Sequence, residues 1–241
     1  MIKYINLLLF AGMIVMNYLA NALPLNNKTT GQLSDSYPNL FVPAGITFSI
    51  WGIIYLLLGV FCGIQFLGSH KGLLLKIGGL FAWSCLLNGI WIVSWHYEKL
   101  PLSLIVMVLL LGILTLLNFR IQNLSLGLVK VTFGIYLGWI CIATIANVTA
   151  LLVHYNWNGF GITEEIWAII MIVLGACIAS WVLFRLQNPF VGLSAIWAFT
   201  GIILKRQDDY TSLVIASSVA IAVVAVFAIW GFLQKNTYSL T

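Results

Sequence analysis

Residues 101–119 read PLSLIVMVLLLGILTLLNF, a stretch that is almost wholly apolar and contains no charged side chain. A helix needs about 20 apolar residues to cross the hydrocarbon core of a bilayer. A helix that is apolar on every side must be buried, either in lipid or in the core of a large protein. This segment is therefore predicted to be a transmembrane helix.

The whole chain of 241 residues has the same character. Hydrophobic residues make up 62% of it and charged residues 7%, and the mean hydropathy is +1.06. A soluble domain carries roughly 25% charged residues, so this composition excludes a soluble domain and a disordered chain. The net charge of +5 is spread singly along the chain apart from Lys205-Arg206. Nucleic-acid binding is not expected, because it needs clustered cations to neutralise phosphates.

Prolines, glycines and polar residues divide the sequence into apolar segments of membrane-spanning length. The segment 189–205 is the shortest, which leaves seven spans as the alternative to eight. We predict an all-α fold, a polytopic transmembrane helix bundle of about eight helices, with a short turn at 68–71. The predicted spans are 2–23, 43–67, 74–97, 101–119, 125–155, 164–187, 189–205 and 210–234.

The first span resembles a secretory signal peptide, because Lys3 precedes an apolar stretch that ends in Ala20-Asn21-Ala22. Asn17, Tyr18 and Asn21 suit a packed helix better than a signal peptide. We therefore expect the first helix to be retained, with cleavage as the alternative.

An even number of spans places both termini on one side of the membrane. Seven Lys and Arg residues would lie on that side and four on the other, and short loops rich in Lys and Arg stay in the cytoplasm. We therefore expect a cell-membrane protein with both termini cytoplasmic. The segments 24–42, 98–101, 156–163 and 205–209 would lie outside. Lys130, about one turn inside its helix, is expected to extend towards the membrane surface.

The spans contain little that supports catalysis. All six acidic residues lie in loops or at helix ends, and P-loop, HExxH and GxSxG motifs are absent. We therefore predict no catalytic residue and consider an enzyme less favoured. The four cysteines lie singly in apolar stretches, so neither a disulfide nor a metal site is expected. His96 and His154 are alternatives as haem ligands, although hydrogen-bonded residues near the membrane surface are the simpler interpretation.

Aromatic and amide side chains recur at helical spacing in three of the spans. An amide that faces hydrocarbon is costly, so these faces should point into the bundle. They are compatible with simple packing and with a ligand pocket that has aromatic walls and a few polar groups. The three faces are Trp51, Tyr55 and Gly59; Asn88, Trp91 and Trp95; and Trp139, Ala143 and Asn147.

The same residues carry a family resemblance. The motifs are Pro43, Trp51, Tyr55 and Gly59 in the second span, Leu87-Asn88-Gly89-Ile90-Trp91 in the third, and Tyr136-Leu137-Gly138-Trp139 with Ala143 and Asn147 in the fifth. In this order they resemble the TspO/MBR family, the tryptophan-rich sensory proteins. The chain departs from the family pattern at Gly45, Ser49 and Ile135.

The resemblance covers about residues 1–155 and implies two parts. Residues 1–155 would form a TspO/MBR-like five-helix membrane core, and residues 156–241 an additional three-helix membrane segment that typical members lack.

The resemblance also implies a function. The chain would be a membrane binding or sensory protein for a hydrophobic planar ligand, either a tetrapyrrole or a sterol-like lipid. A transporter of such a ligand and a porphyrin-degrading enzyme are the alternatives. A porphyrin or haem would then be a ligand, membrane lipids would be partners, and a homodimer stays open. The ligand-binding residues would be Trp51, Tyr55, Asn88, Trp91, Trp95, Trp139 and Asn147.

The segment before the second span suggests a lid over this pocket. Pro38 and Pro43 restrict its backbone, whereas Gly31 and the polar residues near it are expected to leave the first half of the loop mobile. Tyr37 to Val42, with Tyr37 and Phe41 as contact residues, would cover the pocket between the second, third and fifth spans. A simple extracellular linker is the alternative.

Overall fold

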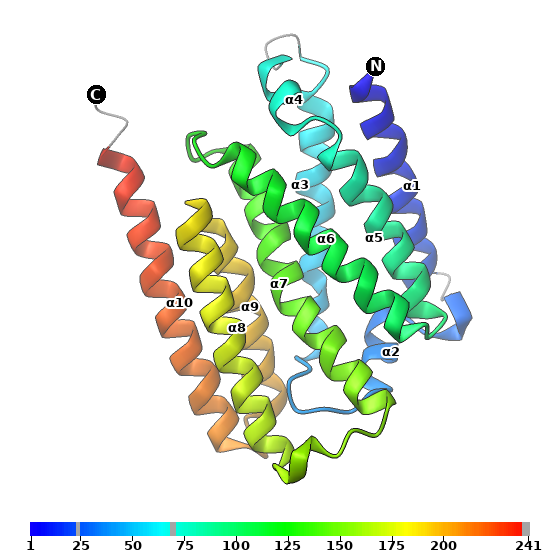
Figure 1. The fold of residues 1–241 in the computed structure, drawn as a ribbon, viewed down its shortest axis with the longest axis vertical. Helices are drawn as coiled ribbons and strands as arrows, with labels where there is room; N and C mark the ends of the chain where they lie inside the picture. The colour runs from blue at the N-terminus through cyan, green and yellow to red at the C-terminus, as the bar shows by residue number, and fades with distance from the viewer. Residues whose placement is uncertain (23–24, 68–70, 238–241) are drawn as a thin grey trace.

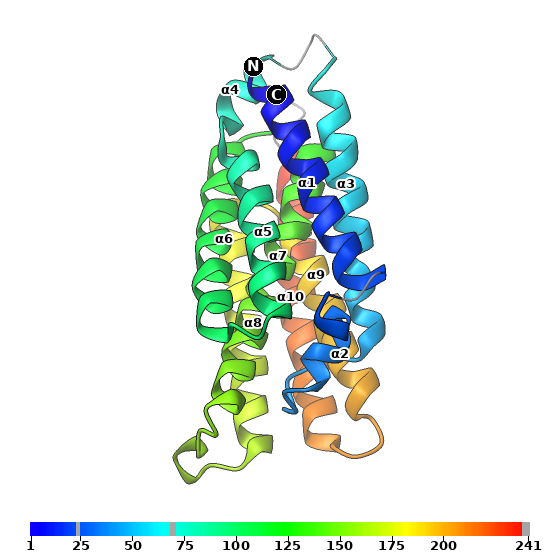
Figure 2. The same ribbon diagram turned by 90° about the vertical axis from the view of Figure 1, so that its right-hand side faces the viewer.

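The computed structural model describes residues 1–22, 25–67 and 71–237, and for Lys71 and 235–237 it describes the backbone alone. These ranges are all-α: long helices run roughly parallel to one another in an elongated bundle (Figures 1 and 2). The long helices are α1 (Ile2–Ala22), α3 (Ile50–Ile64), α5 (Leu80–His96), α6 (Leu100–Ile121), α7 (Leu128–His154), α8 (Glu164–Leu186), α9 (Phe190–Arg206) and α10 (Thr211–Thr237). The short elements are η1 (Leu25–Asn27), α2 (Thr30–Asp35), η2 (Gly45–Ser49), α4 (Lys71–Ile77) and η4 (Gly159–Gly161).

The chain is an integral membrane protein built as a polytopic helix bundle. Six segments of the described chain have both the length and the hydropathy to cross a membrane: Ile2–Ala22, Gly45–Ile64, Leu100–Ile121, Leu128–His154, Glu164–Leu186 and Thr211–Gln234. α5 and α9 have 17 residues each, which is the lower limit for a span. Large apolar side chains such as Leu56, Trp181 and Val226 are exposed on the outside of the bundle, as expected where lipid is the solvent.

The two ends of the bundle differ in what they carry. α2, the α5–α6 turn, the α7–α8 loop and the α9–α10 turn gather at one end, which we call the α2 end (Figure 1). The start of α1, α4 and the end of α10 lie at the opposite end, which we call the α4 end. The predicted grouping of the four loops is therefore observed, although the predicted turn at 68–71 lies mostly outside the described residues.

Two sequence predictions about local structure are wrong. The predicted third span 74–97 is broken into α4 and α5, because Gly78 takes a left-handed conformation (φ 55°) and its N–H bonds the carbonyl of Leu74 at 2.8 Å. This is a typical helix end. The first half of the 24–42 loop forms helix α2, which begins with a capping box between Thr29 and Gln32.

α7 is the central helix of the bundle. It packs against α3 and α6 on one side and against α8 and α9 on the other, and it joins the two groups of helices visible in Figure 1. The contact with α9 depends on two glycines. A Cβ atom at Gly134 would lie 2.6 Å from Oδ1 of Asn188, and one at Gly138 would overlap the carbonyl of Val191. Larger residues at these positions would separate α7 from α9.

A polar cluster near the α4 end joins α6, α7, α8 and α9. Lys130 is fully buried, and its ammonium group donates to the carbonyl of Gln122 at 2.6 Å and to that of Gln187 at 2.9 Å. These carbonyls end α6 and α8, where the helix dipole favours a cation. Lys130 therefore reaches the ends of two neighbouring helices, which provide its partners, and its extension towards the membrane surface stays a prediction.

Two asparagines complete this cluster. Asn188 donates to Oδ1 of Asn118 at 2.8 Å and to the backbone carbonyl of Lys130 at 3.0 Å. Asn118 donates in turn to the carbonyl of Phe133 at 3.0 Å. We call Lys130, Asn118 and Asn188 the Lys130 cluster, and their side chains are bonded to one another or to backbone carbonyls.

Candidate functional site

Three helices bring the predicted aromatic residues together. The Trp51 ring in α3 stacks on Tyr55 at 5.5 Å and on Trp91 of α5 at 5.8 Å between centroids. Trp139 of α7 meets Trp51 edge to face at 6.2 Å, and Trp95 stacks on Trp91 at 6.3 Å. These distances are typical of aromatic contacts that stabilise a core. Five side chains from three helices therefore form one continuous aromatic cluster.

The cluster borders a small cavity, which we call the aromatic cavity. Its volume is about 40 Å³, enough for only a few water molecules. It lies between α2, η2, α3, α5 and α7. Its lining residues are Thr30, Ser34, Pro43, Phe48, Trp51, Trp91, Trp95, Trp139, Ile142, Ala143, Ala146 and Asn147. Five of the seven predicted ligand-binding residues line it; Tyr55 and Asn88 do not.

The indole N–H groups of this cavity are unpaired. Nε1 of Trp91, Trp95 and Trp139 is buried in each case and has no hydrogen-bond partner within the described ranges. The hydroxyl of Thr30, on the rim of the cavity, is also buried and unpaired there. By contrast, the indoles of Trp167 and Trp197 donate to the carbonyls of Gly159 and Thr47. Because buried polar groups are normally bonded, four unpaired groups around one cavity are a notable concentration.

Asn88 is buried, does not line the aromatic cavity, and is bonded through both atoms of its amide. Its carbonyl oxygen accepts from Nδ2 of Asn17 in α1 at 2.8 Å, and its own Nδ2 donates to the Tyr136 hydroxyl in α7 at 3.0 Å. The amide thus connects α1, α5 and α7. The structure gives Asn88 the interior position expected from the sequence, as a link between helices.

Asn147 is bonded through both atoms of its amide and lines the cavity. Its carbonyl oxygen accepts from the Ser103 hydroxyl of α6 at 2.8 Å, and its Nδ2 donates to the carbonyl of Ala143 over a longer 3.3 Å. The amide nitrogen carries a second hydrogen that this bond does not use. Of the two predicted amides, Asn147 is therefore the one that lines the aromatic cavity.

The predicted lid segment, Tyr37 to Val42, packs beside the aromatic cluster at the α2 end, although none of its residues lines the aromatic cavity. Tyr37 and Phe41 are both buried. The Tyr37 ring packs on Trp95 at 6.2 Å and on His154 at 6.0 Å, and its hydroxyl donates to the Glu98 carboxylate at 2.7 Å. That bond lowers the pKa of Glu98 from its ordinary value, and Lys28, at 3.4 Å, lowers it further. Burial, together with the same bond, raises the pKa of Tyr37.

Helix α9 forms hydrogen bonds with the other side of the lid segment and an ion pair with α2 beside it. The Arg206 guanidinium donates to the carbonyls of Asn39 at 2.8 Å and Leu40 at 3.3 Å. Lys205 pairs with Asp35 at 2.8 Å, and the N–H of Ala44 donates to the carbonyl of Gly201 at 2.9 Å. The segment is therefore bonded to the α5–α6 turn on one side and to α9 on the other.

The two histidines weighed as haem ligands occupy different surroundings. His96 is buried, contrary to the interpretation as a surface residue, and its Nδ1 lies 2.9 Å from the carbonyl of Ile92. His154 is exposed at the end of α7. No group of three or more metal-ligating side chains occurs in the described part of the chain.

Several residues of the site were not predicted. Thr30 and Ser34 reach the cavity from α2, and Phe48 reaches it from η2, where its ring meets Trp139 at 6.0 Å. Tyr136 contacts both Trp51 and Asn88. Its position three residues before Trp139 is a usable signal, since i and i+3 share a helix face. The residues of α2 and η2 give no comparable signal.

Residues 3–230 match the family described as TSPO-like protein. The chain belongs to the TSPO-like protein family. The match runs through α8 and α9 and includes most of α10, whereas the sequence motifs ended at Asn147. The family pattern thus extends beyond the five helices expected from the motifs, and the division of the chain at residue 155 stays a prediction. No curated protein and no solved structure matches the chain.

Proposed function

We propose that this TSPO-like membrane protein binds a hydrophobic planar ligand in the aromatic cavity. The observation that carries the proposal is the set of three unpaired indole N–H groups, on Trp91, Trp95 and Trp139, around one cavity. A buried donor without a partner costs about 1–3 kcal/mol. A ligand that supplies acceptor atoms at this place would recover that cost in the bound state.

The chemistry of the walls indicates the class of ligand. The stacked faces of Trp51, Trp91 and Trp95 favour a flat, apolar ring system, while the indole donors and Nδ2 of Asn147 favour oxygen acceptors at its edge. A tetrapyrrole with carboxylate groups satisfies both conditions with several acceptors. A sterol-like lipid satisfies them with one hydroxyl.

The small volume implies that binding opens the site. A cavity of about 40 Å³ is far below the 300–1,000 Å³ that ligand pockets usually have. The lid segment is the element that would open it, since it lies between Ser34 and Pro43, which both line the cavity, and is held by the bond from Tyr37 to Glu98. The bundle described here then corresponds to the closed, unliganded state.

We further propose that the α2 end faces the outside of the cell membrane and both termini face the cytoplasm. The support is the excess of Lys and Arg on the other side. Single cysteines at the exposed positions Ser36 and Asn158, in a cysteine-free background, should react with an impermeant thiol reagent in intact cells. Reaction only after lysis would reverse the orientation.

The binding proposal is tested by titration with protoporphyrin IX in detergent. Wild type should bind it saturably, and Trp139→Phe, which keeps a ring and removes the donor, should weaken binding about tenfold. Trp181→Phe is the matched control, because Trp181 is exposed on the lipid side of α8. Equal affinity of the two variants would contradict the proposal.

The same preparation separates binding from the other functions. A bound porphyrin whose absorbance is stable over hours indicates a binding protein, and a steady loss of absorbance indicates a degrading enzyme. Accumulation of the porphyrin inside proteoliposomes indicates a transporter. If cholesterol binds saturably and protoporphyrin IX does not, the ligand belongs to the sterol class.

A further inference from the structure

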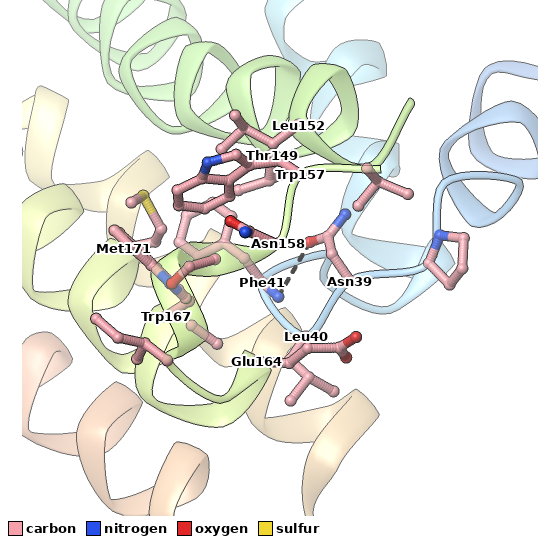
Figure 3. Close-up of a pocket in the computed structure, with 15 residues that line it drawn as sticks. Asn39, Leu40, Phe41, Thr149, Leu152, Trp157, Asn158, Glu164, Trp167 and Met171 are labelled. Carbon is pink, nitrogen blue, oxygen red and sulfur yellow. Dashed lines mark hydrogen bonds between the residues drawn. The ribbon is translucent and has the colours of Figure 1, made fainter. Parts of the chain in front are cut away.

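A second, larger cavity lies at the α2 end, between the lid segment, the end of α7 and the start of α8 (Figure 3). Its volume is about 240 Å³, and we call it the vestibule. It has no lining residue in common with the aromatic cavity. In Figure 3, Trp167 and Met171 lie on one side, and Asn39 and Glu164 on the other.

Two tryptophans form an aromatic corner of the vestibule. The rings of Trp157 and Trp167 meet at 4.8 Å with an angle of 62° between their planes. Nε1 of Trp167 donates to the carbonyl of Gly159 at 2.8 Å, which fixes the orientation of its ring. Phe41 of the lid segment also lines the vestibule, with Leu40, Leu152 and Met171. The walls are therefore mostly aromatic and aliphatic.

The loop that builds this corner has an unusual backbone. Gly159, Phe160 and Gly161 all have positive φ, at 63°, 54° and 77°. A Cβ atom at Gly159 would lie 3.1 Å from Nε1 of Trp167, so the close approach of the indole favours glycine there. The αL conformation of Phe160 costs free energy, of order 1–3 kcal/mol for such residues. Oδ1 of Asn158 holds it by accepting from the N–H of Phe160 at 3.1 Å.

Glu164 is the single charged side chain among the residues that line the vestibule. No hydrogen bond or ion pair of its carboxylate occurs with any residue that the structure describes. Its neighbour Glu165 is different, because that carboxylate accepts from the Ser212 hydroxyl of α10. The two acids in the first turn of α8 therefore differ: one is paired within the fold and one is free at a cavity.

Two cations lie near Glu164 without contacting its carboxylate. Lys205 and Arg206 share a neighbouring cavity with it, but Lys205 pairs with Asp35, and Arg206 donates to the carbonyls of Asn39 and Leu40. The vestibule thus combines aromatic faces with one exposed carboxylate that no cation of the described structure contacts. This combination favours a cation over an anion, because ring faces carry negative potential.

We propose that the vestibule binds a small organic cation with an apolar body. The ammonium group would lie between Glu164 and the faces of Trp157 and Trp167, and the apolar body would pack against Leu40, Leu152 and Met171. A soluble amine and the choline group of a lipid offer the same chemistry. The site does not depend on the ligand proposed for the aromatic cavity.

The test uses 2-phenylethylamine, which is cationic at pH 7, and 2-phenylethanol, its uncharged counterpart, with the full chain in maltoside detergent. Calorimetry should show saturable binding of the amine and at least tenfold weaker binding of the alcohol. Glu164→Gln and Trp157→Leu should each weaken amine binding about tenfold. Glu165→Gln and Trp181→Leu are the matched controls and should stay within twofold of wild type.

Three results would overturn the proposal: equal binding of amine and alcohol, unchanged binding in Glu164→Gln, or no saturable binding in a wild type that melts normally. Lipid nanodiscs then identify the source of the cation. If phosphatidylcholine discs weaken amine binding relative to phosphatidylglycerol discs, the lipid choline group occupies the site. If the two discs agree, the site takes a soluble amine.

Discussion

Two groups of buried polar side chains in this bundle differ in whether they have hydrogen-bond partners. In the Lys130 cluster the ammonium and both amides bond to carbonyls or to each other. Around the aromatic cavity, three indole donors and the Thr30 hydroxyl have no partner among the described residues. Both groups are buried, so exposure to water does not explain the contrast. The paired groups of the Lys130 cluster hold helices together. The unpaired donors around the aromatic cavity are suited to bind a ligand.

The largest effect on stability is expected in the Lys130 cluster. Lys130→Met removes a cation that closes the ends of α6 and α8, and it leaves the carbonyls of Gln122 and Gln187 without this donor. We expect a loss of about 3 kcal/mol in unfolding free energy, measured by SDS titration in mixed micelles. Lys76→Met, at an exposed position of α4, should cost less than about 0.5 kcal/mol. Similar losses in both variants would show that Lys130 acts only through its charge at the membrane surface.

A smaller loss is expected at Asn88. Replacement by Leu leaves Asn17 and the Tyr136 hydroxyl without their partner, which should cost about 1 kcal/mol, as for other hydrogen bonds between membrane helices. Asn17→Leu should cost a similar amount, and the double variant less than the sum of the two. Full additivity in this thermal-melt cycle would count against the bond.

Low pH should weaken the bond between Tyr37 of the lid segment and Glu98. Since its bond with Tyr37 lowers the pKa of Glu98, the bond stabilises the fold fully above the ordinary glutamate pKa of about 4.3. This contribution is lost as the pH falls through the lowered pKa. The melting temperature of wild type should therefore fall below about pH 4.3, and that of Tyr37→Phe should fall less. Lys28 and His154 are charged or titratable groups near Glu98. Parallel curves for the two proteins would assign the acid effect to these or other groups.

The smallest effect on stability is expected at the unpaired donors. Trp139→Phe removes an N–H that makes no hydrogen bond within the described structure, so it should change unfolding free energy by less than about 1 kcal/mol. Trp197→Phe is the matched comparison, because it deletes a donor bonded to the carbonyl of Thr47 at 2.9 Å. Trp197→Phe should lower the unfolding free energy more than Trp139→Phe does. An equal or larger loss for Trp139→Phe would remove the contrast between the two groups.

The sequence predicted the helices better than it predicted their ends. Apolar length located the long helices, and the predicted span boundaries at 97/101 and 187/189 agree with two of the observed turns. The break at Gly78-Gly79 was missed because the apolar pattern continues through it. Helix α2 was missed although Thr29 and Gln32 form a capping box, whose spacing is visible in the sequence.

The site was predictable only where it follows helical spacing. Trp51, Trp91, Trp139 and Asn147 share inward faces, and they line one cavity. The partners of Lys130 could not be predicted, since they are carbonyls at the ends of α6 and α8 that only tertiary packing brings together. The vestibule depends on the left-handed conformation of Phe160, which no pattern of residue types indicates.

We expect a ligand to engage the indole N–H groups of Trp91, Trp95 and Trp139, which have no partner within the described structure. Tryptophan labelled with ¹⁵N in the indole ring gives one N–H signal for each of the ten tryptophans, and each signal can be assigned by a Trp→Phe variant. On addition of protoporphyrin IX, the account predicts that these three signals move and become protected from exchange. Those of Trp167 and Trp197, which are already bonded, should gain no protection. Saturable binding that leaves the three signals unchanged would contradict the account.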